Sequence, residues 1–240
     1  MPVMEIHTGK IIEISSTIGG HSLVIECPVN AIPAAGQYIQ AYSPHDQTSA
    51  VPLSLFLGGT PRIDGSIGHF PCSPPVPESW QPGERLLLRG PLGRGFHISP
   101  KDKRLALVGL DRHISHILPI VEIPGKEIAI FSDAPLPRLP AHVEAYPLQA
   151  LQHNWDWADL MLFDGPAAAY HELPHLLDIP PDEIFPCPAQ ALAAIDMPCG
   201  AIAECGICAV AGRRGKSLLA CQDGPVFSLS ERGLEVQKVR

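Results

Sequence analysis

The stretch Leu105-Ala106-Leu107-Val108-Gly109 divides this chain of 240 residues into two kinds of sequence. Its apolar residues follow one another without a polar interruption, which is typical of a parallel strand buried on both faces. Short alternating segments precede it, and apolar runs separated by longer connections follow it. We therefore expect the architecture to change near residue 104, from a β-domain to an α/β domain.

The N-terminal part reads as a series of short strands that end in glycine- or proline-containing turns. These predicted strands cover residues 3–14, 22–27, 37–43, 53–57 and 85–89. Many short strands with such turns indicate a small β-barrel or sandwich. We assign residues 1–100 to this domain.

The central part alternates between apolar strands and predicted helices. Strands are expected at 105–109, 127–131 and 159–164, with a helix around residues 113–121 and a further helix starting near Pro166. This pattern predicts an α/β domain over residues 101–185. Proline-rich residues then lead into a cysteine-rich segment, residues 186–240.

Four cysteines in that last segment have the spacing C-x5-C-x2-C-x12-C, and they are Cys199, Cys205, Cys208 and Cys221. Plant-type [2Fe-2S] proteins have C-x4-C-x2-C and a distant fourth cysteine. The extra residue in the first interval adds at most about 3.5 Å of chain, which a bulge can absorb. Glycines and alanines between the cysteines suit a loop that wraps closely around a cluster. The pattern predicts a [2Fe-2S] cluster and hence electron transfer.

Other interpretations of the cysteines stay open. A structural zinc site usually has two separate CxxC-like pairs, whereas only Cys205 and Cys208 form one here. Disulfides are disfavoured because the chain has seven cysteines and no evident secretory signal. Inert buried thiols are the remaining alternative. Cys27, Cys72 and Cys187 have no ligand spacing.

Composition excludes several classes of function. The net charge of −8 argues against a nucleic-acid partner, and no apolar run is long enough for a membrane span. Free cysteines without a leader predict a cytoplasmic protein. The 27 prolines indicate short elements with stiff connections.

Three motifs carry a resemblance to a known family: Ala35-Gly36-Gln37-Tyr38, Gly90-Pro91-Leu92-Gly93-Arg94-Gly95-Phe96, and Cys221-Gln222-Asp223-Gly224-Pro225-Val226-Phe227. With them the chain resembles the iron–sulfur/flavin electron-transfer subunit of two-subunit dihydroorotate dehydrogenases, a family of the ferredoxin–NADP reductase superfamily. The resemblance implies a ferredoxin-reductase-like core of β-barrel plus α/β domain, followed by a small C-terminal [2Fe-2S] domain. The three parts would be residues 1–100, 101–185 and 186–240.

The resemblance also implies cofactors and a partner. FAD would lie against the barrel, with contacts at Pro52, Leu53, Ser54, Gly90 and Gly93. Electrons would pass from reduced nicotinamide to FAD, and through the cluster to a separate flavin-containing catalytic subunit of pyrimidine biosynthesis. Substrate chemistry would belong to that partner, so no catalytic residue is assigned to this chain.

The chain departs from the family pattern at two places. The flavin-contacting arginine is replaced in Val51-Pro52-Leu53-Ser54, which should weaken the hold on the FAD pyrophosphate. The glycine-rich nucleotide loop is replaced by Gly109-Leu110-Asp111-Arg112-His113-Ile114-Ser115-His116, and Asp164 stands where the family has cysteine. We therefore do not expect NAD to bind in the standard way. Asp111, His113 and His116 could ligate a metal, although a polar surface is the favoured interpretation.

Two functions follow from these residues. The first is an electron-transfer subunit with a [2Fe-2S] cluster and a weakened FAD site. The second is a non-catalytic structural or regulatory subunit that keeps the fold and a cluster or zinc ion, but has lost flavin and NAD.

Overall fold

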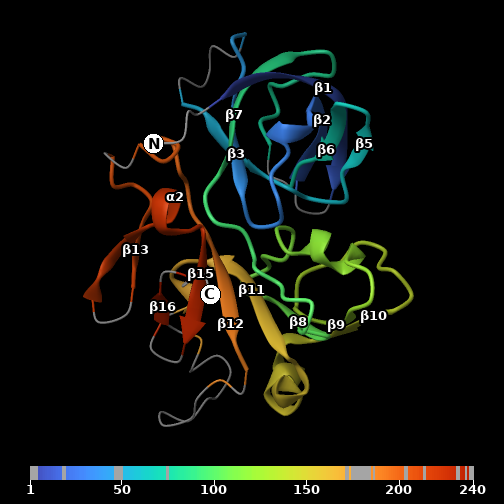
Figure 1. Ribbon diagram of the computed structural model, residues 1–240, viewed down its shortest axis with the longest axis vertical. Coiled ribbons are helices and arrows are strands. Elements are labelled where there is room, and N and C mark those ends of the chain that lie inside the picture. Colours follow the sequence, from blue (N-terminus) through green and yellow to red (C-terminus); the bar gives the residue numbers. More distant parts are fainter. Residues whose placement is uncertain are drawn as a thin grey trace.

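A computed structural model describes most of the chain as two seven-stranded sheets joined end to end (Figure 1). No described helix has the length and apolar character that crossing a membrane requires. The described residues are 5–17, 20–45, 51–73, 76–170, 173, 185, 187–202, 205–212, 215–230, 233–235 and 237.

The first sheet is antiparallel and has the strand order β4-β3-β7-β1-β2-β6-β5. A bridge between Leu57 and Cys72 connects the ends of β4 and β6, and so closes the sheet into the predicted barrel. Gly58 permits this closure, because a Cβ atom there would lie 2.5 Å from the backbone nitrogen of Ser73. The elements are β1 (Ile6–Thr17), β2 (Gly20–Pro28), η1 (Val29–Ala31), β3 (Tyr38–Tyr42), β4 (Leu53–Phe56), β5 (Arg62–Asp64), β6 (Ile67–Pro71) and β7 (Arg85–Leu92).

The period-2 pattern of the barrel strands determines which side chains enter the barrel core. Leu86 and Leu88 on β7 are buried, whereas Leu87 between them is 44% exposed. Ile39 on β3 and Ile25 on β2 join the same core. Alternation along a strand is expected for a sheet with one solvated face.

The second sheet has the order β10-β9-β8-β11-β12-β15-β16, in which the first five strands are parallel and the last two are antiparallel additions. Residues 186–240 thus contribute three strands to this sheet. Strands β13 (Ala209–Ala211) and β14 (Ser217–Leu219) form a separate two-stranded sheet. The other elements of this half are β8 (Arg104–Gly109), η2 (Leu118–Glu122), β9 (Glu127–Phe131), β10 (Val143–Tyr146), η3 (Leu148–His153), η4 (Trp155–Trp157), β11 (Leu160–Pro166), β12 (Ala189–Ala194), α2 (Ala220–Asp223), β15 (Val226–Ser230) and β16 (Gly233–Glu235).

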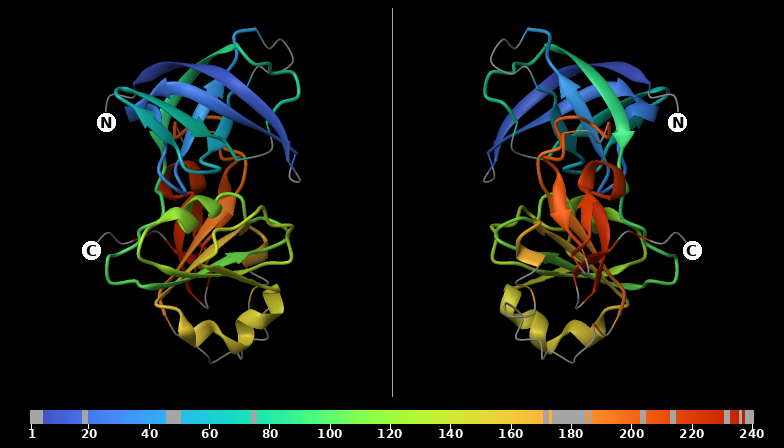
Figure 2. Two further views of the ribbon diagram at one scale, coloured as in Figure 1. Left: turned by 90° about the vertical axis from the view of Figure 1, so that its right-hand side faces the viewer. Right: turned by 90° about the vertical axis from the view of Figure 1, so that its left-hand side faces the viewer.

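Both faces of the parallel sheet are covered, as the continuous apolar run of β8 predicts. Leu105 and Leu107 pack on one face with the residues around η2. Ala106 and Val108 pack on the other, in a core that also contains barrel residues and buried cysteines. Figure 2 shows α2 at the waist of the molecule, between the barrel and the parallel sheet.

The predicted helix over residues 113–121 is wrong. This segment consists of turns followed by the short 3-10 helix η2. Pro119 lacks an N–H donor, and the β-branched Ile114, Ile117 and Ile120 disfavour an α-helix. The expected helix start near Pro166 is also displaced, because β11 continues through that residue.

A histidine–aspartate hydrogen bond holds this irregular segment against the sheet. Asp164 at the end of β11 is fully buried, and its Oδ1 lies 2.9 Å from His116 Nδ1. The His116 backbone N–H donates to Asp164 Oδ2 at 3.0 Å. The other side of the imidazole contacts Phe56 of β4, with ring centroids 4.6 Å apart. His116 therefore connects the barrel to the carboxyl end of the parallel sheet.

Replacing His116 should destabilise the protein, because it would leave a buried carboxylate without its main partner. We expect His116→Ala to lower the free energy of unfolding by about 3 kcal/mol. Urea denaturation followed by circular dichroism would measure this. His113→Ala is the matched control, because the Nδ1 of His113 contacts only the exposed Asp111 carbonyl oxygen, and a change within about 0.5 kcal/mol is expected. Equal effects of the two substitutions would contradict the structural role of the pair.

Candidate functional site

The three sequence motifs of the predicted family meet at one place, the seam between the barrel and the second sheet. The Arg94 N–H donates to the Gly224 carbonyl oxygen at 2.6 Å, and the Phe96 N–H donates to the Ala35 carbonyl oxygen at 3.0 Å. Gln37 Nε2 donates to the Gly93 carbonyl oxygen at 3.2 Å. The motifs therefore act together in joining the two halves of the molecule.

Gly90 and Gly93, which were predicted to contact FAD, lie against protein atoms. A Cβ atom on Gly93 would come within 2.5 Å of Pro225 Cδ, and the φ of Gly93 is +73°. A Cβ atom on Gly90 would lie 3.0 Å from Ile39 Cγ2. Both positions require glycine for backbone packing. Their role as cofactor contacts stays a prediction.

The cysteine segment places two of the predicted ligands side by side. Strands β13 and β14 form a hairpin in which Ala209 pairs with Leu219. One step further, the Ala220 N–H donates to the Cys208 carbonyl oxygen at 3.0 Å. Cys208 at the start of the hairpin therefore lies beside Cys221 in α2, and both are buried.

Cys199 joins these two cysteines, whereas Cys205 does not. Burial raises the pKa of the Cys221 thiol to about 12, and hydrogen bonds and charge from Cys208 and Cys199 contribute to the shift. Cys205 is exposed. Within the described part of the chain, no group of three or more His, Cys, Asp or Glu side chains is arranged to hold a metal ion. Cys221 therefore interacts with both Cys208 and Cys199, but the described cysteines are not grouped around a metal-sized space, and Cys205 is exposed.

Tyr38 covers the three inner cysteines from the barrel side. Its hydroxyl donates to the Cys221 carbonyl oxygen at 3.4 Å, and its side chain is fully buried. Burial raises the pKa of Tyr38 well above its usual value, and the neighbouring Cys221, Cys199 and Cys208 raise it further. The phenol therefore stays protonated and remains a hydrogen-bond donor at neutral pH.

A buried glutamine holds the turn that carries Cys199. Gln40 on β3 is 4% exposed, and its Nε2 donates to the carbonyl oxygens of Met197 at 3.0 Å and Pro198 at 2.9 Å. Gly200 makes room for this contact, because a Cβ atom there would lie 1.9 Å from Gln40 Oε1. Sequence reasoning missed Gln40. Its only signal was a polar residue between apolar ones in the predicted strand 37–43.

Two further barrel side chains reach the same turn. Arg89 Nη1 donates to the Cys199 carbonyl oxygen at 3.5 Å and to Gln40 Oε1 at 3.4 Å. Ser54, the register partner of Gln40, directs its hydroxyl to the Met197 carbonyl oxygen at 3.5 Å. The hydroxyl predicted to face a flavin thus contacts the cysteine segment. Beside it Pro52 and Leu53 are half-buried, and Val51 is 51% exposed.

The place where a dinucleotide phosphate would lie in a doubly wound sheet is occupied by side chains. That place is beyond the carboxyl ends of β8 and β11, where the strand order reverses. Leu110 is fully buried there, and a Cβ atom on Gly165 would lie 2.9 Å from Leu110 Cβ. Asp111 and Arg112 have positive φ values of 49° and 64° without being glycine. These residues offer no glycine-built cradle of N–H groups.

Comparison with known proteins finds similar folds among solved structures, but no match to the sequence itself. No protein-family model and no curated protein matches the sequence. The structure is similar to the NADH-dependent reduced ferredoxin–NADP oxidoreductase studied for flavin-based electron bifurcation, with a TM-score of 0.67 and 17% identity over 95% of this chain and 90% of that chain.

A second similar structure is the ferredoxin reductase in carbazole 1,9a-dioxygenase, with a TM-score of 0.53 and 16% identity over 74% of this chain and 66% of that one. Its FAD apo form has a TM-score of 0.52 and 17% identity, and the match covers 72% of this chain and 61% of that one. In both structures of this reductase, the chain thus spans less than two thirds of its length. At these identities the comparisons establish a ferredoxin-reductase-like fold, as the sequence predicted.

Proposed function

We propose that this chain is an electron-transfer subunit. It holds a [2Fe-2S] cluster at Cys199, Cys205, Cys208 and Cys221, and it exchanges electrons with a separate flavin-containing catalytic subunit. The observation that carries the proposal is that Cys221 interacts with both Cys208 and Cys199 beneath Tyr38, where Cys208 and Cys221 are buried and Cys199 is half-buried. When bound, such a cluster supplies one-electron transfer.

The cysteines supply the donor chemistry of a cluster, but the described side chains are not grouped as a metal site in this structure. Cys221 interacts with Cys208 and Cys199, and the exposed Cys205, three residues before Cys208, would have to move in to complete the set. Gly200, Ala201 and Gly206 have positive φ values of 55°, 68° and 69°, which curl the backbone around the cysteines. Curled backbone of this kind directs N–H groups toward bound anions. Zinc would use the same thiols, so the metal must be identified chemically.

Barrel residues would position and tune the site. Gln40 and Ser54 anchor the Met197–Pro198 backbone, and Arg89 brings a positive charge to the Cys199 carbonyl. A positive charge beside a cluster favours its reduced form, because reduction adds negative charge. The barrel thus has a part in the electron-transfer site besides any flavin.

FAD on the barrel and a partner of the dihydroorotate dehydrogenase type are the finer parts of the proposal. They rest on the family resemblance and on the ferredoxin-reductase-like fold. The specific observation for the alternative, a non-catalytic subunit, is the filled nucleotide place around Leu110 and Asp164. Flavin content in the purified protein distinguishes the two.

The cluster is tested by metal and sulfide analysis on anaerobically purified protein. We expect two irons and two sulfides per chain with visible absorbance, as a [2Fe-2S] centre requires. Cys205→Ser should lose the iron and the colour without unfolding, since Cys205 is exposed. Cys187→Ser is the control and should keep both. Full iron and colour in Cys205→Ser, or zinc without sulfide in the wild-type protein, would contradict the assignment.

The glutamine contact gives a second prediction. Gln40→Met removes the two hydrogen bonds that Gln40 Nε2 donates to the Met197 and Pro198 carbonyl oxygens. The Met197 oxygen keeps the Gly200 N–H and the Ser54 hydroxyl as donors, so the main loss is at the Pro198 oxygen. We expect a loss of about 2 kcal/mol in unfolding free energy, and faster loss of iron to a chelator. Gln81→Met, at an exposed position, is the matched control. Unchanged iron release in Gln40→Met would show that the barrel does not hold the site.

A third prediction concerns flavin. Val51→Arg restores a charged, potentially bidentate contact for a pyrophosphate at an exposed position. FAD affinity should rise about tenfold, measured by quenching of FAD fluorescence on titration. Ile63→Arg adds the same charge at another exposed barrel position and should leave the affinity unchanged. Equal affinities of wild-type and Val51→Arg protein would mean that this strand does not contact the pyrophosphate.

A further inference from the structure

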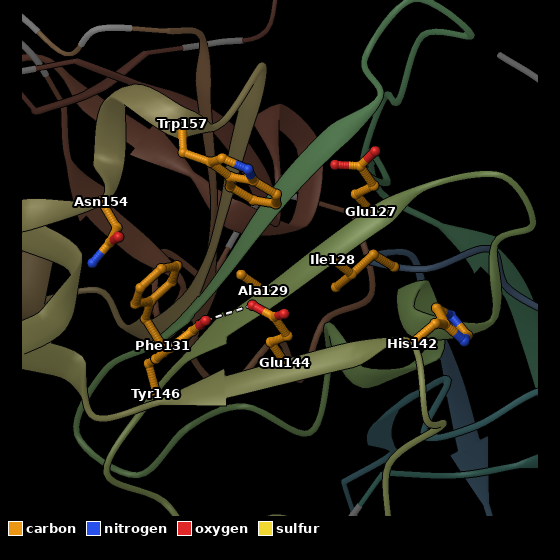
Figure 3. Close-up of a pocket in the computed structure, with 9 residues that line it drawn as sticks. All are labelled: Glu127, Ile128, Ala129, Phe131, His142, Glu144, Tyr146, Asn154 and Trp157. Carbon is orange, nitrogen blue, oxygen red and sulfur yellow. Dashed lines mark hydrogen bonds between the residues drawn. The ribbon is translucent and has the colours of Figure 1, made fainter.

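A cavity of about 380 Å³ lies on the parallel sheet at the edge farthest from the cysteines (Figure 3). Strands β8, β11 and β12 separate it from β15, so it is distinct from the proposed electron-transfer site. Its volume is within the range of small-molecule pockets. Ala129 lines the cavity between Phe131 and the start of β9, and it is neighboured on β8 by the equally small Ala106.

Three aromatic side chains line this cavity. Phe131 on β9 and Tyr146 on β10 are register partners and stack with ring centroids 5.5 Å apart. Trp157 of η4 stands across from them, as Figure 3 shows. The guanidinium carbon of Arg104 lies 6.0 Å from the centroid of the Trp157 ring, at the outer limit of a cation–π contact.

Two carboxylates complete the lining, Glu127 on β9 and Glu144 on β10. The Tyr146 hydroxyl donates to Glu144 Oε2 at 2.5 Å and fixes the orientation of that carboxylate. Glu144 pairs with Ala129, so Glu127 lies two residues, about 7 Å, further along the strands. That spacing suits an organic head group better than a single metal ion, and no metal-holding group of three side chains lies in the described residues.

The local charge is negative despite the nearby arginine. Arg104 Nη2 lies 2.8 Å from Asp159 Oδ1, so Asp159 neutralises it at the rim. Glu127 interacts with Arg104 only at longer range. Arg104 is not part of the lining, and the lining histidine, His142, has its Nε2 3.3 Å from the Val121 carbonyl oxygen. The two glutamates thus leave a surplus of negative charge beside aromatic rings.

From this combination we infer that the cavity binds a small organic cation with an alkylammonium head group. Aromatic rings attract weakly hydrated cations, and quaternary ammonium groups are bound in this way between rings. The two exposed carboxylates add charge attraction that salt will screen. The site would bind its ligand whether or not the cysteines hold a cluster.

Choline and its neutral isostere 3,3-dimethyl-1-butanol test the inference on the full-length protein by isothermal titration calorimetry. They share a shape and differ in charge. We expect choline to bind at least about tenfold more tightly than the alcohol, and raised salt to weaken choline binding. No choline binding, or equal binding of the two compounds, would overturn the assignment.

Two substitutions in the lining test whether choline binds in this cavity. Glu144→Gln removes the charge at an exposed position and should weaken choline binding about tenfold, whereas the exposed Glu13→Gln on the barrel should not change it. Ala129→Leu should fill the hollow and abolish binding. Its fold is checked by circular dichroism, and Glu144→Gln decides the question if Ala129→Leu does not fold. Wild-type affinity in Glu144→Gln would place the cation elsewhere.

Discussion

The two halves of the molecule depend on a short piece of backbone pairing between Arg94 and residues 224–226. The Arg94 N–H donates to the Gly224 carbonyl oxygen at 2.6 Å, and the Val226 N–H donates to the Arg94 carbonyl oxygen at 3.3 Å. Because Arg94 follows β7 and Val226 begins β15, the last barrel strand leads directly into the second sheet. Glycine at position 93 is needed for this approach, since Pro225 occupies the space of a side chain.

This pairing also determines where the cysteines lie. Cys221 precedes Gly224 by one short helix, so the docking of β15 against Arg94 brings Cys221 under Tyr38. Cys208 follows through the β13–β14 hairpin, and Cys199 is held by Gln40. The site is therefore built between the barrel and the sheet, and neither half would form it alone.

The sequence predicts those strands whose apolar residues follow a continuous or alternating pattern. The continuous apolar run at 105–109 and the alternation at 85–89 both correspond to observed strands. The helix at 113–121 failed because the buried carboxylate of Asp164, 48 residues away, binds the His116 N–H. Strand β5 was missed because its residues are all exposed and carry no alternation.

The candidate site shows the reach of local sequence patterns. Cysteine spacing predicted one ligand set, Cys199, Cys205, Cys208 and Cys221, which stays a prediction. In the structure Cys221 lies near Cys199 and Cys208, whereas Cys205 is exposed. Spacing could not indicate that Cys205 stays exposed, since that depends on how the loop leaves the turn at Gly200. Gln40 lies 157 positions before Met197, so no local pattern could connect them. Contacts between distant segments are decided by packing, which one sequence does not reveal.

Because Gln40 contacts a segment far along the chain, part of the barrel stays uncovered while the protein is being synthesised. The barrel strands leave the ribosome first, and domains generally fold as units during synthesis. Gln40 then faces solvent until the Met197 turn emerges, roughly 105 residues after β7 ends, and Tyr38 until Cys221 and β15 emerge, roughly 130 residues after it. Each interval is on the order of 10 s at common translation rates. During those intervals a buried glutamine and tyrosine are open to other chains. A partner subunit or chaperone present at that time would meet a polar, aromatic surface that the finished protein conceals.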